Sequence, residues 1–151
     1  MKRFKFKLEN VLNYRVTLEG LAKNAYQEAL RVLNIEKEAL HKLQTVKQAL
    51  TQSYNIQAGA VVSPETLTLL SRYAVQLSHL IEKQTQVVAD KQAIATEKFQ
   101  EWNRKRMDVK VIERLKEKKW HEYLSEMDKE DQKFQDEIFI AKTIRETRER
   151  Q

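Results

Sequence analysis

Cysteine is absent from this 151-residue chain, and it contains only two glycines and one proline. Without cysteine there is neither a disulfide framework nor a thiolate metal site, which suits a reducing compartment. Two isolated glycines cannot build a phosphate-binding loop, because neither GxGxxG nor GxxxxGK occurs. The sequence therefore excludes disulfide-rich scaffolds and enzymes that depend on such loops.

Long apolar runs are also missing. The opening MKRFKFKLENVLNYR is basic, but no continuous apolar stretch follows it, so we predict no secretory signal. Nowhere do about 18 apolar residues run together, so we predict no transmembrane segment.

The rest of the chain consists largely of helix formers: Ala, Leu, Val, Gln, Lys and Glu. Charged residues make up 33% and aromatic residues only 8%, which argues against a thick compact core and favours a rod. The net charge of +6 favours acidic partners, whether nucleic acid, anionic lipid or an acidic protein surface.

Heptad spacing predicts a first helix over about residues 8–55. Three neighbouring rows of apolar residues, mostly seven apart, define its buried face: Val11, Leu18, Ala25, Val32, Ala39 and Val46; Leu12, Tyr26, Leu33, Leu40 and Tyr54; Leu8, Ala22, Ala29, Leu43 and Leu50. Gly20 falls inside this pattern and costs about 1 kcal/mol relative to alanine, but we expect the helix to continue through it.

The pattern lapses at residues 56–63, where we predict a turn. Ser63 followed by Pro64 is a helix start signal, because the hydroxyl caps the helix and proline needs no amide partner at the first helical position. The second helix is predicted over about residues 64–146. Its rows include Leu67, Ala74, Ile81, Val88, Ala95, Trp102 and Val109, with Tyr73, Leu80, Val87 and Ile94 on one flank.

Two long helices joined by a short turn predict an all-α fold, a long antiparallel two-helix coiled-coil hairpin with an overhanging C-terminal helix. We expect residues 1–151 to form this single hairpin. With the turn near residue 60, position i faces roughly 120 − i, so Leu8 lies opposite Ile112. Everything beyond Ile112 is then expected to overhang without an intrachain partner.

The expected overhang carries an apolar stripe at helical spacing: Trp120, Leu124, Met127, Phe134, Ile138 and Ala141. Basic residues lie at its base, in residues 2–7 and at Arg114, Lys116, Lys118 and Lys119. Residues 121–140 hold seven acidic side chains and two lysines. This arrangement fits either a solvated helix face with i, i+4 ion pairs or a charged tip that meets a partner.

No catalytic constellation is visible. His41 and His79 could approach each other across the hairpin, but no further metal ligand is evident, and we read them as surface residues. His121-Glu122 lacks the second histidine of a zinc-protease pair. A two-helix rod also offers no concave pocket to tune carboxylates. We therefore expect no enzyme activity, cofactor or metal, and place function in binding.

The two ends of the sequence resemble the FliJ family of flagellar type III export proteins. The opening FKFKLENVLNYR resembles the family's N-terminus, and KVIERLKEKKWHEYLSEMDKEDQKFQDE is similar to its C-terminal block. The resemblance implies a non-enzymatic stalk, like the gamma subunit of rotary ATPases, inserted into a hexameric export ATPase. It also implies contacts with the export gate membrane protein and with export chaperones, in the cytoplasm at the inner membrane.

On this reading, the end of the chain contacts the ATPase ring. The expected contacts are Arg114, Lys116, Lys118, Lys119, Trp120, Leu124, Met127, Phe134 and Ile138. For the apolar stripe, the alternatives are a dimer contact or fraying in the free protein.

A second expected surface lies near the turn. The resemblance of YAVQLSHLIEKQ to the family's gate-docking stretch, together with the row spacing, assigns docking of the export gate to Leu43, Leu50, Tyr54, Tyr73, Leu77 and Leu80. Tyrosine is enriched where partners bury a surface, although Leu77 also fits intrahelical packing. Lys47 departs from the row, where an uncharged residue is preferred.

Other readings remain open at the level of sequence. The chain could be the equivalent stalk of a virulence type III secretion system, or a generic basic coiled-coil scaffold. A nucleic-acid-binding rod is disfavoured because the basic residues are spread out and diluted by carboxylates. The segment KRFKFK could lie on anionic lipid, but so short a stretch is a weak anchor.

Overall fold

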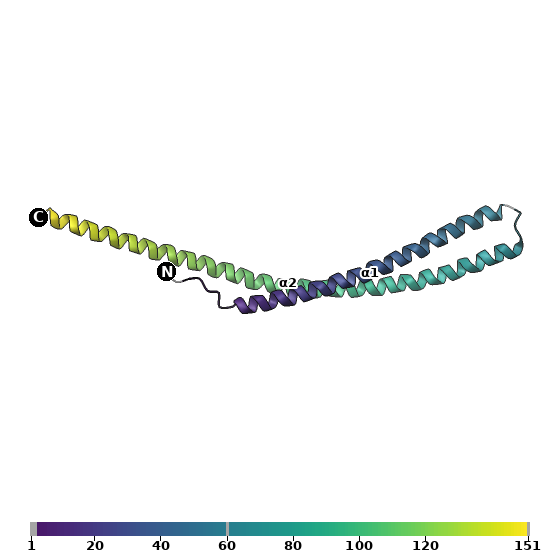
Figure 1. Cartoon of the computed structure of the whole chain (residues 1–151), viewed down its shortest axis with the longest axis horizontal. Coiled ribbons are helices and arrows are strands. Elements are labelled where there is room, and N and C mark those ends of the chain that lie inside the picture. Colours follow the sequence, from purple (N-terminus) through teal and green to yellow (C-terminus); the bar gives the residue numbers. More distant parts are fainter. Residues whose placement is uncertain (1–2, 60, 151) are drawn as a thin grey trace. The chain divides into compact units, whose positions relative to one another are not determined.

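The computed structural model describes residues 3–59 and 61–150, without the side chains of residues 57 and 58. These residues form two helices, α1 (Glu9–Ala58) and α2 (Pro64–Glu149), and no strand occurs among them. The two helices pack against each other in opposite directions (Figure 1), which confirms the predicted all-α helical hairpin. Lys2 of the predicted basic end and residue 60 of the predicted turn lie outside the described residues.

The start of α2 follows from its first residues. The Ser63 hydroxyl accepts a hydrogen bond from the Thr66 amide at 3.3 Å, and the two hydroxyls lie 2.9 Å apart. Ser63 thus caps the helix, Pro64 occupies its first position and Glu65 adds a negative charge to the first turn. This confirms the helix start predicted from Ser63-Pro64.

Helix α1 runs through Gly20 without interruption, as expected from the heptad pattern on either side. A Cβ added at Gly20 would meet nothing within 4 Å. The glycine therefore fills no steric need, and packing of the rows around it keeps this stretch helical despite its low propensity.

The chain divides into two compact units, each with segments of both helices. Unit 2 comprises residues 18–105. In it, α1 and α2 run alongside each other and are joined by the turn (Figure 1). Its most buried side chains are Leu33, Leu77 and Ala95, which are 2%, 3% and 1% exposed. Leu33 and Ala95 lie on the apolar rows given by the heptad pattern, whereas Leu77 was assigned to the docking surface near the turn.

Polar contacts fix the register within unit 2. The Gln84 side-chain amide donates to the Glu36 carbonyl at 3.0 Å and to the Glu36 carboxylate at 2.6 Å. The Trp102 indole N–H donates to the Glu19 carboxylate, and the Trp102 ring stacks on Tyr26 with centroids 5.6 Å apart. The numbers of the pair Glu36 and Gln84 add up to 120, which agrees with the predicted register.

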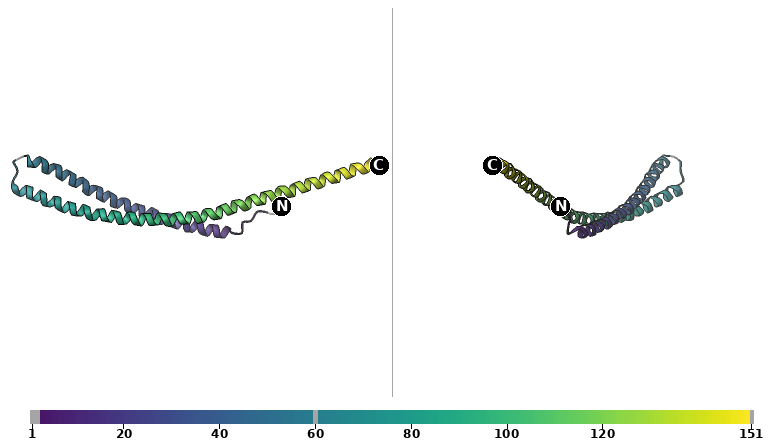
Figure 2. Two further views of the ribbon diagram at one scale, coloured as in Figure 1. Left: turned by 180° about the vertical axis from the view of Figure 1, so that it is seen from behind. Right: turned by 60° about the vertical axis from the view of Figure 1, so that its left-hand side comes forward.

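Unit 1 comprises residues 3–17 and 106–150 among those described. Here the N-terminal segment and the start of α1 lie beside α2 (Figure 2). Its core consists of Leu12, Val109 and Ile112, with Phe6 packed against them. Arg15 donates to the Asp108 carbonyl at 3.1 Å, and Lys116 lies 2.9 Å from Glu9. No helix among the described residues is both long and apolar enough to cross a bilayer.

Candidate binding surfaces

Residues 3–8 precede α1, and we call them the N-terminal arm. The Phe4 ring meets Trp120 edge-on, with centroids 5.1 Å apart and an interplanar angle of 78°, and lies 5.5 Å from Tyr123. Trp120 and Tyr123 also stack on each other at 5.5 Å. The arm thus covers the first part of the predicted stripe.

This contact corrects one expectation. The stripe beyond Ile112 was expected to have no intrachain partner, which is wrong for Trp120. The prediction assumed that packing against the second helix stops at Leu8, where the first helix was expected to begin. The chain before α1 instead continues along α2, because Phe4 and Phe6 gain aromatic and apolar contacts there. Trp120 still keeps 42% of its surface exposed.

The expected basic residues at this end are partly neutralised within the chain. Lys116 pairs with Glu9, and its ammonium lies 5.9 Å from the centroid of the Phe6 ring. Lys119 donates to Glu122 at 2.6 Å. That hydrogen bond lowers the pKa of Glu122 and raises the pKa of Lys119, with the attraction between the two charges adding to both effects. Arg114 and Lys118 are exposed.

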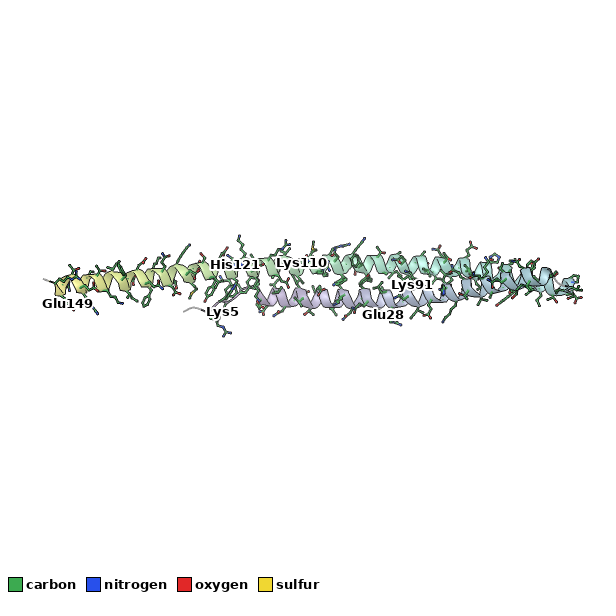
Figure 3. The ribbon with its side chains drawn as sticks, turned by 90° about the horizontal axis from the view of Figure 1, so that it is seen from above. Lys5, Glu28, Lys91, Lys110, His121 and Glu149 are labelled. Carbon is green, nitrogen blue, oxygen red and sulfur yellow. The ribbon has the colours of Figure 1, made fainter. Side chains whose placement is uncertain are left out.

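A cavity of about 420 Å³ lies beside the arm. Phe4, Phe6, Leu8 and Leu115 form its apolar lining, and Lys5, Lys7 and Lys119 border it. Figure 3 labels Lys5 in the arm and His121 on α2. Both phenylalanines contact α2, Phe4 at Trp120 and Tyr123 and Phe6 at Val109 and Ile112.

The far part of α2, residues 128–150, is exposed at every position. We call it the free end. Of the predicted stripe, Phe134 is 64% exposed and Ile138 is 42% exposed; nearer the arm, Leu124 is 39% exposed and Met127 is half-buried. Sequence reasoning missed Phe139, Ile140 and Ile144, which are 71%, 56% and 49% exposed. The consecutive apolar residues IFIA at 138–141 could have indicated these exposed positions. They were missed because a search for apolar residues on one helix face leaves out side chains that point in other directions.

The second expected surface is only partly accessible. Tyr54, Tyr73 and Leu80 are exposed, whereas Leu43 and Leu50 are half-buried. Leu77 is 3% exposed and therefore belongs to the core of unit 2, which leaves it out of reach of a partner. Near the turn, a small cavity of about 190 Å³ is lined by residues that include Leu50, Tyr54 and Leu70.

Across the described residues, no group of three or more His, Asp or Glu side chains is arranged to hold a metal ion. His121 lies 4.0 Å from Glu117 within one helix turn, which is an ordinary surface pair.

The described residues form a helical hairpin that exposes several large apolar side chains, a feature typical of protein-binding surfaces. The family comparison is more specific. The model of the flagellar FliJ protein family matches residues 4–148, so the chain belongs to the FliJ family. Membership makes it a structural component of type III protein export, as the sequence resemblance indicated.

Among solved structures, one similar chain is a putative YscO homolog from Chlamydia trachomatis. It is 19% identical, and the match covers 90% of this chain and 93% of that one with a TM-score of 0.49. No curated protein matches the chain.

Proposed function

We propose that this protein is the central stalk of a hexameric flagellar export ATPase, has no catalytic activity of its own, and promotes assembly of the ring. Family membership over residues 4–148 supports the export role. The observation that carries the stalk role is the free end of α2. Residues 128–150 are exposed throughout, yet include Phe134, Ile138 and Phe139. A helix that exposes several large apolar side chains is typical of a surface that a partner covers.

The length of the free end suits insertion into a ring. From Asp128 to Glu149 the helix rises by about 32 Å at 1.5 Å per residue. Arg114 and Lys118 stand exposed at its base, where they are available for acidic groups at the rim of the ring. Lys116 and Lys119 are already paired with Glu9 and Glu122 and contribute less.

The role in linking the ring to the export gate rests on the surface near the turn. Tyr54, Tyr73 and Leu80 expose apolar area, and the two tyrosines, a residue type enriched at interfaces, add phenolic hydroxyls. We propose that these residues dock the cytoplasmic part of the gate protein and that export chaperones also bind the hairpin. The protein would then act in the cytoplasm, at the inner face of the membrane that holds the gate.

The test is ATP turnover by the export ATPase of the same organism, with and without this chain. We expect stimulation together with ring assembly in analytical ultracentrifugation. Replacing Phe134 and Ile138 with aspartate should weaken binding to the ATPase by at least about 30-fold, as removal of interface anchors does. Leu69→Asp is the matched control, because Leu69 is 69% exposed and lies in unit 2.

Equal stimulation by the Phe134→Asp, Ile138→Asp variant would overturn the assignment of the free end. Absence of stimulation by the unmodified chain, with circular dichroism showing a folded helix, would overturn the stalk role itself. Binding to the gate is measured separately, with Tyr73→Ala and Leu80→Ala expected to weaken it and the free-end variant expected to leave it unchanged.

A further inference from the structure

Unit 2 carries a second apolar row on each helix, beside its core. Val32 directly precedes Leu33, which is 2% exposed, and Ile94 directly precedes Ala95, which is 1% exposed. The same position recurs every seven residues on both helices. On α1 the row is Leu18, Ala25, Val32, Ala39 and Val46, and on α2 it is Tyr73, Leu80, Val87 and Ile94.

Both rows lie on the same side of unit 2. Antiparallel helices are related by an approximate two-fold axis that points out of the plane containing them. Residues that precede core positions on one helix therefore share a side with those that precede core positions on the other. In the register where Glu36 meets Gln84, Val32 is level with Val87 and Val46 with Tyr73.

This side is apolar but still open to solvent. Val46, Tyr73, Leu80 and Ile94 are 43%, 46%, 49% and 43% exposed. Farther out on α1, the next row adds Leu21 and Ile35, which are 62% and 51% exposed. The helix pair alone therefore leaves much of this face uncovered.

The other side of unit 2 is different in kind. The positions that follow the core there are mostly polar, and Leu30 and Phe99 interrupt them. The polar members include Lys23, Lys37 and Gln44 on α1 and Ser78, Thr85 and Gln92 on α2. A hairpin that needed only solubility would have polar residues on both sides, so the asymmetry indicates a surface that is covered.

Charges at the edge of the apolar side differ between its two ends. Lys83 and Lys42, the latter in an exposed ion pair with Glu38 at 3.6 Å, lie toward the turn, whereas Asp90 and Glu97 lie toward the other end of the unit. Such an edge favours a helix whose acidic residues meet the two lysines and whose basic residues meet the two carboxylates. Like charges in the reverse placement would be repelled.

We propose that this side of unit 2 binds one amphipathic helix of another protein, which completes a three-helix bundle. The groove between two helices has room for one further helix, and apolar residues at i, i+3, i+4 and i+7 would fill it. The rows from residue 18 to 46 span about 42 Å, the length of a helix of about 28 residues. Charge segregation along the partner helix sets its direction. This proposal does not depend on the stalk role. It shares Tyr73 and Leu80 with the proposed gate-docking surface, but most of the binding face is the row from Leu18 to Val46 on α1.

The test uses the full chain and a fluorescein-labelled 28-residue peptide. The peptide has leucine at heptad core positions, glutamates toward one terminus and lysines toward the other. A peptide of the same composition with its leucines scattered over all faces is the control. Fluorescence anisotropy should show saturable binding of the first peptide, weakened at least about tenfold by Leu21→Glu with Ile35→Glu. Gln27→Glu with Asn34→Glu adds the same charge at exposed positions off this face and should leave binding within about twofold.

A second pair of variants tests the charges. Lys42→Glu with Lys83→Glu should weaken binding of the peptide whose glutamates and lysines lie at opposite ends. Binding of a peptide with the same charges evenly mixed should be unchanged. No saturable binding, or equal binding by the Leu21→Glu, Ile35→Glu variant, overturns the proposal. Sedimentation equilibrium gives the remaining outcome: a dimer that becomes a monomer in that variant would show that a second copy covers the face, which also overturns it. Circular dichroism confirms that each variant is folded.

Discussion

The contact between the N-terminal arm and α2 gives a sharp prediction for Phe4→Ala. The Phe4 ring makes two aromatic contacts, with Trp120 at 5.1 Å and Tyr123 at 5.5 Å. Each such contact is worth about 0.5–1.5 kcal/mol beyond area burial, so the substitution removes about 1–3 kcal/mol. That loss shifts the equilibrium between docked and undocked arm by roughly 5- to 150-fold.

The arm is sensitive because ordering it is costly. Fixing the backbone of one residue costs about 1–2 kcal/mol, and the arm has few contacts to offset this. Phe6 holds one end of the arm against Leu12, Val109 and Ile112. Phe4 holds the other end, so we expect residues 3–5 to leave α2 in the variant while Phe6 stays docked.

The assay is fluorine NMR of the full chain labelled with 5-fluorotryptophan. The chain has two tryptophans, and a Trp120→Phe variant assigns their signals. In Phe4→Ala, the Trp120 signal should move and its solvent isotope shift should rise, because the ring loses its cover. The Trp102 signal lies in unit 2 and should stay in place. Lys5→Ala, at an exposed arm position, should change neither signal. A Trp120 signal that keeps its position and isotope shift in Phe4→Ala would refute the reasoning.

Four further predictions concern stability and charge. Leu33→Ala should lower the free energy of unfolding by about 2–5 kcal/mol in urea titrations, since Leu33 is 2% exposed; a smaller loss would contradict tight packing. Ser63→Ala should cost about 1 kcal/mol by removing the cap of α2, and Ser63→Asp should restore it. Gly20→Ala should stabilise by up to about 1 kcal/mol, because its Cβ meets nothing within 4 Å; destabilisation would show a hidden close contact. Lys119→Ala should raise the pKa of Glu122 in carbon-detected NMR titrations. Because the pKa of Glu122 is lowered in the folded chain, its pair with Lys119 stabilises the folded state at pH values above the pKa that Glu122 has in the unfolded chain. This stabilisation is lost as the pH falls through the pKa of Glu122 in the folded chain.

Much of the fold could be predicted because its determinants are local and periodic. Heptad rows identify the buried faces, and Ser63-Pro64 marks the start of α2. Once the turn is placed, antiparallel pairing follows by counting, which is why Glu36 meets Gln84 as the register requires. Buried Leu33 and Ala95 lie on the predicted rows for the same reason.

The arm and the free end could not be predicted as well, because their determinants are not periodic. Phe4 and Phe6 alternate in a short stretch without regular secondary structure, and nothing in that spacing identifies Trp120 as the partner of Phe4. Phe139 and Ile140 follow Ile138 directly, so they point away from the stripe and escape a search for one face. Leu77 shows the opposite error, since its row fits both a docking surface and the core, and only packing shows that it is buried.

The connection between α1 and α2 has a consequence for how the chain folds and opens. Paired residues become more distant in sequence away from it: 48 residues separate Glu36 from Gln84, 83 separate Glu19 from Trp102, and 107 separate Glu9 from Lys116. If the pair Glu9 and Lys116 formed directly from the unfolded chain, the entropic cost of closing its loop would exceed that for Glu36 and Gln84 by only about 0.7 kcal/mol of free energy. If pairs form in order from the turn outward, even this difference disappears, because each new pair closes only a short loop. We expect hydrogen exchange to be slowest around Leu33 and Leu77 and to quicken toward Glu9, so that the end bearing the arm can open repeatedly while the helices stay paired around Leu33 and Leu77.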